Sequence, residues 1–492
     1  MLTGHTTAPR LARVVRVREA AAVAAVAGVV GWAIALGRPW TELAAAAVLL
    51  LAAAARARWN ALRLSSSFLV VELPILLLLF LDVYYPRVRT ATDLAGNPLD
   101  AGGMVKLAAV GLVVLIGCIA FATSTAPPRP TTAPFRLFVV YVVVAFFGVG
   151  FSVDPLLTAF RGLEIAAAAV VVAGAYRRYG QAAVARLERL LYGATVALVV
   201  SVWVGVAVAQ SEALVPTPSS PLPSQIQGVY PKIASNGVGT LGVILALWSL
   251  GGLVSRSPRE RMRRPVAVAL TALGVATLLG AQYRTGYAAF AAGVALLLAL
   301  RGRKTLAAAI GLFAAVVMYW GLATVGTSTE PLLLRGDTVE RAGQLSGRIS
   351  MWHAAIPFWR ESPLFGRGLL TSTRLEVLPS IGLQDTATIH GTWIETLVGT
   401  GLAGTALLAA AMLLLLYRSL QEALRRDGRV VPVLLATSLI VRSLTGSSVE
   451  SLGIGALLLV VLALGLAPER SRQRVPASPR HSAPPARLGV PS

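Results

Sequence analysis

A histidine stands just ahead of a hydrophobic, glycine-rich segment in the stretch DTATIHGTWIETLVGTGLAG, residues 385–404. This residue, His390, is one of only four histidines in the chain. Its imidazole could accept a proton near neutral pH, as a general base for a hydroxyl group must do. A buried histidine that only stabilises the fold would suit this position equally well, so the residue types alone leave both roles open.

The glycines that follow His390 have a simpler interpretation. Gly399, Gly401 and Gly404 lie on or near one face of the helix expected there. Small residues let membrane helices approach closely, so Gly401 and Gly404 are interpreted as a helix-packing motif.

Basic residues at the ends of hydrophobic segments form the second group that could do chemistry. They are Arg161 in FSVDPLLTAFRGLE, Lys232 in GVYPKIASN, Arg284 in AQYRTGY and Arg442 in IVRSLTGSS. A cation at the rim of a helix bundle suits an anionic headgroup, and a guanidinium is the group best shaped for bidentate phosphate binding. The alternative is snorkelling or a simple ion pair, for example Arg442 with Glu450.

Metal, nucleotide and serine-hydrolase chemistry find no support in the sequence. No second His, Cys or carboxylate stands at metal-ligand spacing from His390, and no HExxH motif occurs. Walker and GxSxG motifs are absent too. We therefore expect no metal and no cofactor. His353, which follows Trp352, is expected to pack or to face the surface.

The elements that position these residues are membrane helices. Hydrophobic residues make up 56% of the 492-residue chain and charged residues 13%, with a mean hydropathy of +0.72. Soluble domains are about one quarter charged. The apolar residues occur in runs of roughly 17–25, long enough to cross a bilayer as helices. The sequence therefore predicts an all-α, polytopic transmembrane helix bundle of about 12–14 spans.

The net charge of +22 reflects topology rather than nucleic-acid binding. Arginines cluster in short loops between apolar runs, as in SRSPRERMRRP at residues 255–265, and such loops stay on the cytoplasmic side. With a cytoplasmic N-terminus, the expected spans place roughly 30 of the 44 Lys and Arg residues inside. These spans lie near residues 20–36, 42–56, 67–84, 103–123, 134–150, 160–176, 184–208, 233–254, 265–281, 285–300, 304–323, 392–417, 430–446 and 451–467.

One interval, residues 326–390, is too long for an ordinary connection and is expected on the extracytoplasmic side. Its segment GRISMWHAAIPFWRES carries apolar residues at near-helical spacing, which predicts a helix on the membrane surface or against the bundle. The chain therefore divides into five parts: a basic cytoplasmic tail (1–19), an N-terminal transmembrane bundle (20–325), a long extracytoplasmic loop expected to be catalytic (326–390), C-terminal transmembrane helices (391–468) and a disordered cytoplasmic tail (469–492).

Residues 347–404 resemble the signature segment of the O-antigen ligase and polymerase family of membrane glycosyltransferases. That family carries a histidine, a polar neighbour, nine further residues and then Gly-x-x-Gly. His390, Gly401 and Gly404 match this spacing, whereas Gly391 departs from the polar neighbour. Upstream, GRISMWHAAIPFWRESPLFGRGLLTS resembles the family's arginine, tryptophan, proline and Gly-x-Gly block. The matching residues are Arg348, Trp352, Pro363, Gly366 and Gly368. AQYRTGY resembles the family's Ser-Arg-Gly-like turn, with Arg284 as the arginine.

The resemblance implies metal-independent transfer of a glycan from an undecaprenyl diphosphate carrier to an acceptor hydroxyl, at the extracytoplasmic face of the bacterial inner membrane. A diphosphate leaving group gains negative charge in the transition state, and fixed cations would stabilise it. That role is assigned to Arg284 and Arg348, with Lys232 and Arg161 as weaker candidates. His390 would deprotonate or orient the acceptor hydroxyl. The expected partners are the undecaprenyl-diphosphate-linked glycan, a glycan or lipid acceptor and the lipid bilayer, with no nucleic acid.

Four alternatives stay open, one of which is a member of the same family that O-glycosylates proteins. A ligase passes the glycan to a lipid A core or similar anchor, whereas a polymerase of the same family passes it to another lipid-linked repeat unit; the histidine-to-glycine spacing favours the ligase. A lipid-linked oligosaccharide flippase would need charged residues at mid-membrane, where the chain offers mainly Glu72. A peptidoglycan polymerase would rely on an acidic residue of the long loop, and no matching motif surrounds the candidates there, which are Asp337, Glu340, Glu361 and Asp385.

Overall fold

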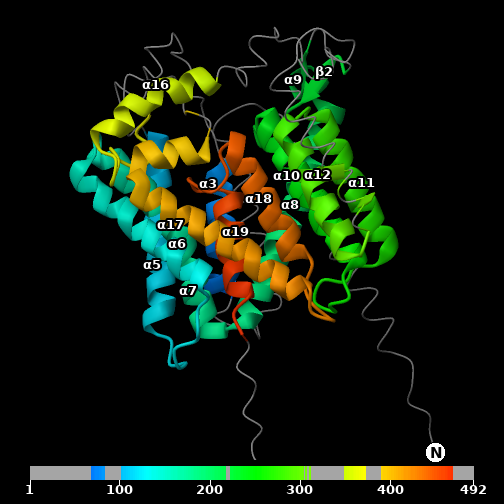
Figure 1. Cartoon of the computed structure of the whole chain (residues 1–492), viewed down its shortest axis with the longest axis horizontal. Helices are drawn as coiled ribbons and strands as arrows, with labels where there is room; N and C mark the ends of the chain where they lie inside the picture. Colours follow the sequence, from blue (N-terminus) through cyan, green and yellow to red (C-terminus); the bar gives the residue numbers. More distant parts are fainter. Residues whose placement is uncertain are drawn as a thin grey trace, which may run out of the picture.

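The computed structural model describes residues 68–83, 101–217, 222–303, 348–372, 389 and 391–468, together with residues 305, 306, 308, 310 and 311. Over these residues the protein is an all-α, polytopic membrane helix bundle, as predicted (Figure 1). The expected spans near 20–36 and 42–56, most of the span near 304–323 and both expected tails lie outside the described residues.

Eleven apolar helices occupy the described parts of the chain, one for each span expected there. Six are long and apolar enough to cross a membrane: α5 (Ala101–Ala122), α6 (Ala133–Phe147) with the 3-10 turn η2 (Gly148–Phe151), α7 (Pro155–Tyr179), α8 (Gln181–Val208), α10 (Ser235–Val254) and α17 (Thr392–Ala423). The shorter ones are α3 (Leu73–Val83) with the π-helical turn η1 (Phe68–Glu72), α11 (Arg264–Gly280), α12 (Arg284–Leu300), α18 (Val431–Thr445) and α19 (Ile454–Gly465).

Four short elements lie between these spans. The helix α9 (Gln210–Ala213) leads into the antiparallel hairpin of β1 (Leu214–Pro216) and β2 (Ser224–Ile226), in which Val215 pairs with Gln225. The amphipathic helix expected in the long loop is present as α16 (Arg348–Glu361).

Local sequence explains where the spans begin. Asp154 caps α7 by accepting a hydrogen bond from the backbone N–H of Leu157 at 3.0 Å, and Pro155 occupies the first helical position. Thr132 caps α6 in the same way and is also followed by a proline near the helix start. These caps satisfy N–H groups that the first helical turn would otherwise leave without partners.

The bundle has two unlike ends. The helix α16 and the hairpin lie at one of them, called here the α16 end (Figure 1). At the opposite end, called here the arginine end, Arg429 joins elements that are far apart in sequence. Its Nη2 lies 2.6 Å from Glu188 of α8, and its Nε lies 3.1 Å from Glu260 of the loop between α10 and α11. Burial lowers the pKa of Arg429, but the two carboxylates outweigh burial and hold that pKa above its usual value.

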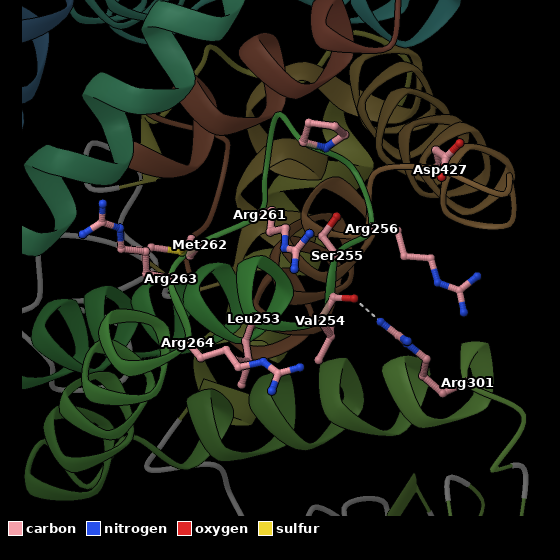
Figure 2. Close-up of a pocket in the computed structure, with 11 residues that line it drawn as sticks. Leu253, Val254, Ser255, Arg256, Arg261, Met262, Arg263, Arg264, Arg301 and Asp427 are labelled. Atoms are coloured by element: carbon pink, nitrogen blue, oxygen red, sulfur yellow. Dashed lines mark hydrogen bonds between the residues drawn. The ribbon is translucent and has the colours of Figure 1, made fainter.

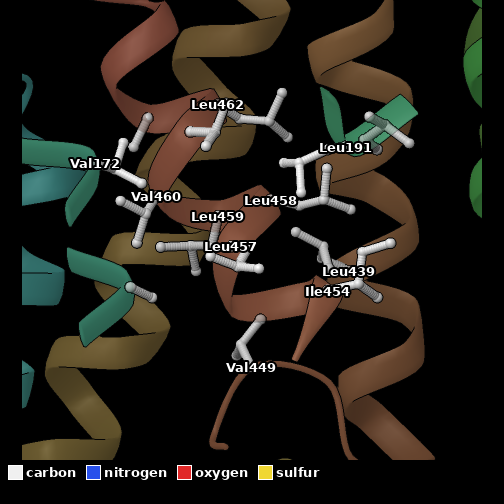
Figure 3. Packing of buried hydrophobic residues seen from close by; sticks show 14 of the residues in the cluster. Val172, Leu191, Leu439, Val449, Ile454, Leu457, Leu458, Leu459, Val460 and Leu462 are labelled. Carbon is white, nitrogen blue, oxygen red and sulfur yellow. The ribbon is translucent and has the colours of Figure 1, made fainter. Parts of the chain in front are cut away.

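The core is organised around α19. Every residue from Ile454 to Leu464 is buried, so this helix, which is apolar on all of its faces, packs against other helices all round. Figure 3 shows its leucines and valines packed among Val172 of α7, Leu191 of α8 and Leu439 of α18. Helices from both halves of the chain thus share a single core.

Candidate active site

The turn between α11 and α12 fixes the position of Arg284. Gln282 adopts a left-handed φ of 50°, and its side-chain amide donates to the carbonyl of Ser224 in the hairpin at 3.0 Å. Arg284 is the first residue of α12 and is half-buried. The hydroxyl of the next residue, Thr285, lies 2.7 Å from the hydroxyl of Thr445 at the end of α18. The start of α12 is therefore held against the last turn of α18.

Arg348 reaches the same turn from another direction. It is the first residue of α16, and its Nη1 donates to the backbone carbonyl of Thr445. Burial lowers the pKa of the Arg348 guanidinium, which remains charged because an arginine starts so far above neutrality. Arg284 and Arg348, two residues that the sequence analysis paired for one role, thus both flank Thr445.

A third arginine, Arg442, lies one turn before Thr445 on α18. Its side chain is only 4% exposed, and its Nε and Nη1 have no hydrogen-bond partner in the part of the chain that the structure describes. The ion pair suggested for it with Glu450 is wrong, because no such pair occurs among the described residues. Glu450 instead accepts hydrogen bonds from the hydroxyl of Thr392 at 2.7 Å and the backbone N–H of Ser448 at 2.9 Å.

These three residues, Arg284, Arg348 and Arg442, are called here the arginine cluster. They come from α16 and from the facing ends of α12 and α18, and they surround the last turn of α18 at the α16 end. A buried guanidinium such as that of Arg442 is costly without an anion, so the arrangement suits a phosphate or diphosphate.

The two weaker cationic candidates lie on other elements, Arg161 on α7 and Lys232 in the turn before α10. Arg161 donates from Nη1 to Glu164 at 2.9 Å, and Lys106 binds the other oxygen of the same carboxylate at 2.7 Å. The Glu164 side chain is only 1% exposed, so both cations help to compensate a buried charge. Lys232 is exposed in the turn that leads from the hairpin into α10. Neither Arg161 nor Lys232 has a hydrogen bond or ion pair with the arginine cluster within the described residues.

The long span α17 is broken at Gly401, where the sequence analysis expected an uninterrupted helix. Gly401 has φ 64° and ψ −167°, a conformation that is unfavourable for residues other than glycine. Beyond the break, the N–H groups of Leu402 and Ala403 donate to the carbonyls of Pro363 and Leu364 at 2.8 and 3.0 Å. Backbone from the long loop therefore satisfies N–H groups that the broken helix cannot.

The same loop also supplies donors for the carbonyls before the break. The N–H of Arg367 donates to Val398 at 2.8 Å, and the N–H of Gly368 donates to Gly399 at 2.9 Å. Gly366 makes this approach possible, because a Cβ there would lie 2.5 Å from the carbonyl carbon of Gly399. The Gly-x-Gly block and the Gly-x-x-Gly segment, which the sequence separates, form one structural unit.

Gly404 makes room inside its own helix. A Cβ at this position would lie 2.1 Å from the hydroxyl of Thr400, one turn earlier. That hydroxyl donates to the carbonyl of Thr396 at 2.8 Å. Gly401 and Gly404 thus shape α17 and its junction with the loop, and the side chain that Gly404 accommodates belongs to α17 itself.

His390 lies outside the described residues, but both of its neighbours are placed. Ile389 is fully buried, and its N–H is 3.5 Å from Oε2 of Glu395. Gly391 lies against Trp352, since a Cβ there would be 2.9 Å from the indole Nε1. The absence of a side chain at Gly391, which departs from the family pattern, therefore has a steric reason.

Glu395 is a site residue that the sequence analysis did not select. It is 2% exposed, and its Oε2 also accepts a hydrogen bond from the hydroxyl of Ser372 at 2.8 Å. One carboxylate oxygen thus contacts residues on both sides of the stretch 373–388. The sequence signal was a carboxylate inside an apolar helix, which is rare unless it has a task.

Among the described residues, no three His, Cys, Asp or Glu side chains gather in a way that would hold a metal ion. Residues 268–409 of the chain match the family model described as O-antigen ligase. That interval contains Arg284, Arg348, His390, Gly401 and Gly404, whereas Arg161, Lys232 and Arg442 lie outside it. No curated protein matches the chain.

Proposed function

Through residues 268–409 this chain belongs to the O-antigen ligase and polymerase family, and on that premise we propose that it transfers a glycan from an undecaprenyl diphosphate carrier to an acceptor hydroxyl. In this reaction the bond between the anomeric carbon and the diphosphate breaks, and a bond from that carbon to the acceptor oxygen forms. The acceptor loses a proton, and the diphosphate leaves with the bonding electron pair.

The observation that carries the proposal is the arginine cluster around the last turn of α18. The negative charge of the departing diphosphate grows in the transition state, and preorganised guanidinium groups stabilise such charge strongly in a site shielded from water. Arg348 is anchored by the carbonyl of Thr445, and Arg442 is buried without an anionic partner among the described residues. A diphosphate would supply the missing counter-charge.

His390 is proposed as the group that takes the acceptor proton. A general base must lie within hydrogen-bond reach of the hydroxyl that it activates, so its chain segment has to be held firmly. The flanking contacts of Ile389 with Glu395 and of Gly391 with Trp352 provide that support. These contacts lie at the α16 end, as does the arginine cluster.

We place the α16 end on the extracytoplasmic side of the bacterial inner membrane. Loops rich in arginine stay in the cytoplasm, and the loops at residues 255–264 and 424–429 lie at the opposite, arginine end. Donor diphosphate, acceptor and catalytic groups would then meet at the outer surface. Within this reaction class, ligase and polymerase differ only in the acceptor, and the ligase is the first choice.

The test is glycan transfer in proteoliposomes that contain an undecaprenyl-diphosphate glycan and a chelator. We expect transfer by the unaltered protein and its loss in His390→Ala and Arg284→Ala, whereas Arg418→Ala, an exposed arginine of α17 near the arginine end, serves as the matched control. Mass analysis of the product identifies the acceptor, a lipid anchor for a ligase or a second repeat unit for a polymerase. Full activity of His390→Ala would refute the base assignment. Lipid movement between leaflets without transfer would identify a flippase.

A further inference from the structure

A basic cavity of about 1070 Å³ lies at the arginine end, where α10 ends and α11 begins (Figure 2). It is called here the basic pocket. The loop Ser255–Arg263 forms one wall, and residues that follow α12 and α17 contribute to the others. Five arginines and one carboxylate line it: Arg256, Arg261, Arg263, Arg264, Arg301 and Asp427.

The acidic residue of the loop does not neutralise these arginines. Glu260 is directed to the start of α18, where its Oε2 accepts hydrogen bonds from the N–H of Val430 at 2.8 Å and from the hydroxyl of Ser255 at 2.9 Å. Its Oε1 lies 3.1 Å from Nε of Arg429. Both oxygens are occupied, so the positive charge of the basic pocket has no compensation from this side.

Other arginines at the same end are compensated by the chain itself. Arg259 lies 2.9 Å from Glu188, and Arg425 lies 2.6 Å from Glu422. Four arginines of the basic pocket lack such a partner. Their guanidinium groups form no hydrogen bond or ion pair with any residue in the described ranges. They are Arg256, Arg261, Arg263 and Arg264. Orienting the helices in the membrane requires only that a cytoplasmic loop carry positive charge. It does not require the charged side chains to line one cavity.

The floor of the basic pocket is apolar and well fixed. Met262 packs on Gly252, where an added Cβ would lie 2.5 Å from its sulfur, and the N–H of Met262 donates to the Gly252 carbonyl at 3.0 Å. Arg301 donates to the carbonyl of Val254. Figure 2 shows Arg261, Arg264 and Leu253 among the residues that line the basic pocket. Cations above an apolar floor at the end of membrane helices match the boundary between lipid headgroups and acyl chains.

We propose that the basic pocket binds the phosphate-bearing headgroup of an anionic phospholipid from the leaflet at the arginine end, with Arg261 and Arg264 as the main contacts. The apolar floor favours a lipid over a free phosphate, because a free anion gains nothing from Leu253 and Met262. The basic pocket is separate from the arginine cluster and does not depend on the proposed transfer reaction.

The test is native mass spectrometry of the purified full chain titrated with phosphatidylglycerol, cardiolipin or phosphatidylcholine. The double variant Arg261→Gln, Arg264→Gln should bind the two anionic lipids about tenfold or more weakly, since each arginine near a headgroup contributes appreciably to anionic-lipid affinity. The double variant Arg418→Gln, Arg425→Gln removes the same charge from exposed sites on or just after α17 and should bind them as the unaltered protein does.

Each other outcome overturns the assignment. Equal weakening in both double variants would mean that the overall charge of this end attracts the lipid. Equal affinity for phosphatidylcholine would remove the requirement for an anion. Displacement of the anionic lipid by millimolar inorganic phosphate would assign the basic pocket to a free anion. A thermal unfolding curve for each variant ensures that weaker binding is not a consequence of misfolding.

Discussion

The guanidinium of Arg348 donates to the backbone carbonyl of Thr445, a residue 97 positions later in the chain. This hydrogen bond ties the start of α16 to the end of α18. It brings a positive charge of the long loop to the turn of α18 that carries Arg442 and that contacts Thr285, the residue after Arg284. The loop helix is thus part of the membrane bundle at the position where the diphosphate is proposed to bind.

Replacing Arg442 with an apolar residue should lower the transfer activity without lowering the stability of the fold. An uncompensated buried cation is costly, so Arg442→Leu should leave the free energy of unfolding unchanged or raise it by about 1–4 kcal/mol. The same change should reduce transfer by about 100-fold, because a stabilising charge is lost in the transition state. Thermal unfolding and initial transfer rates measure the two effects. A variant that is both unstable and inactive would show that Arg442 serves the fold.

The break at Gly401 should tolerate no side chain. Gly401→Ala would strain the left-handed φ and place a Cβ 2.3 Å from the carbonyl carbon of Leu364. We therefore expect the free energy of unfolding to fall by about 2 kcal/mol or more. Gly404→Ala is the matched comparison, because its Cβ meets the Thr400 side chain rather than backbone. Combining it with Thr400→Gly, which removes both the hydroxyl and the Cβ that the added methyl would meet at 2.1 and 2.4 Å, should recover stability, as denaturation curves can test. Equal stability of Gly401→Ala and the unaltered protein would contradict the described break.

Glu395 should influence turnover more than substrate affinity. Glu395→Ala leaves the Ser372 hydroxyl and the Ile389 N–H without their acceptor and loosens the segment that carries His390. We expect kcat to fall about tenfold or more with a smaller change in KM, since mispositioning of a catalytic group acts on the chemical step. Glu395→Gln keeps an acceptor oxygen and should recover much of the rate. Failure of glutamine to do so would mean that the negative charge itself is required.

Removing Arg429 should unfold the arginine end first. Arg429→Ala leaves the carboxylates of Glu188 and Glu260 buried with one cation fewer, a change that costs about 3–5 kcal/mol. Arg259 still contacts Glu188, which limits the loss on that side. Hydrogen exchange should therefore increase most at the start of α18, whose N–H groups bind Glu260. Uniform exchange over the whole bundle would argue against a local role.

Much of the fold was predictable from the sequence. Apolar runs fix the spans because a helix in lipid must satisfy its own backbone and cover it with apolar side chains. The near-helical spacing of apolar residues in GRISMWHAAIPFWRES also predicted the helix that the structure shows as α16. Arg284 and Arg348 were expected to act together. Arg348 contacts Thr445 of α18 itself, and Thr285, the residue after Arg284, contacts the same threonine.

The remaining features depended on contacts that no sequence period reveals. The apolar pattern runs through Gly401 without interruption, and the partners of the broken backbone come from a loop almost forty residues earlier. Arg442 and Glu450 are eight residues apart with opposite charge, but Glu450 binds the backbone of Ser448 and Val449 instead. The ion pair of Arg161 with Glu164 was visible in the sequence as an i, i+3 spacing, and the role of Arg161 as a weaker candidate stays a prediction.

The hydrogen bonds that Glu395 accepts from Ser372 and Ile389 have a consequence for sequence variation between these two residues. The two residues bracket the stretch 373–388, and their contacts to one carboxylate oxygen keep both anchor points at a constant separation. Sequence and length between the anchors can therefore vary without shifting the backbone on either side. Exchanging that stretch should therefore leave both hydrogen bonds to Glu395 in place.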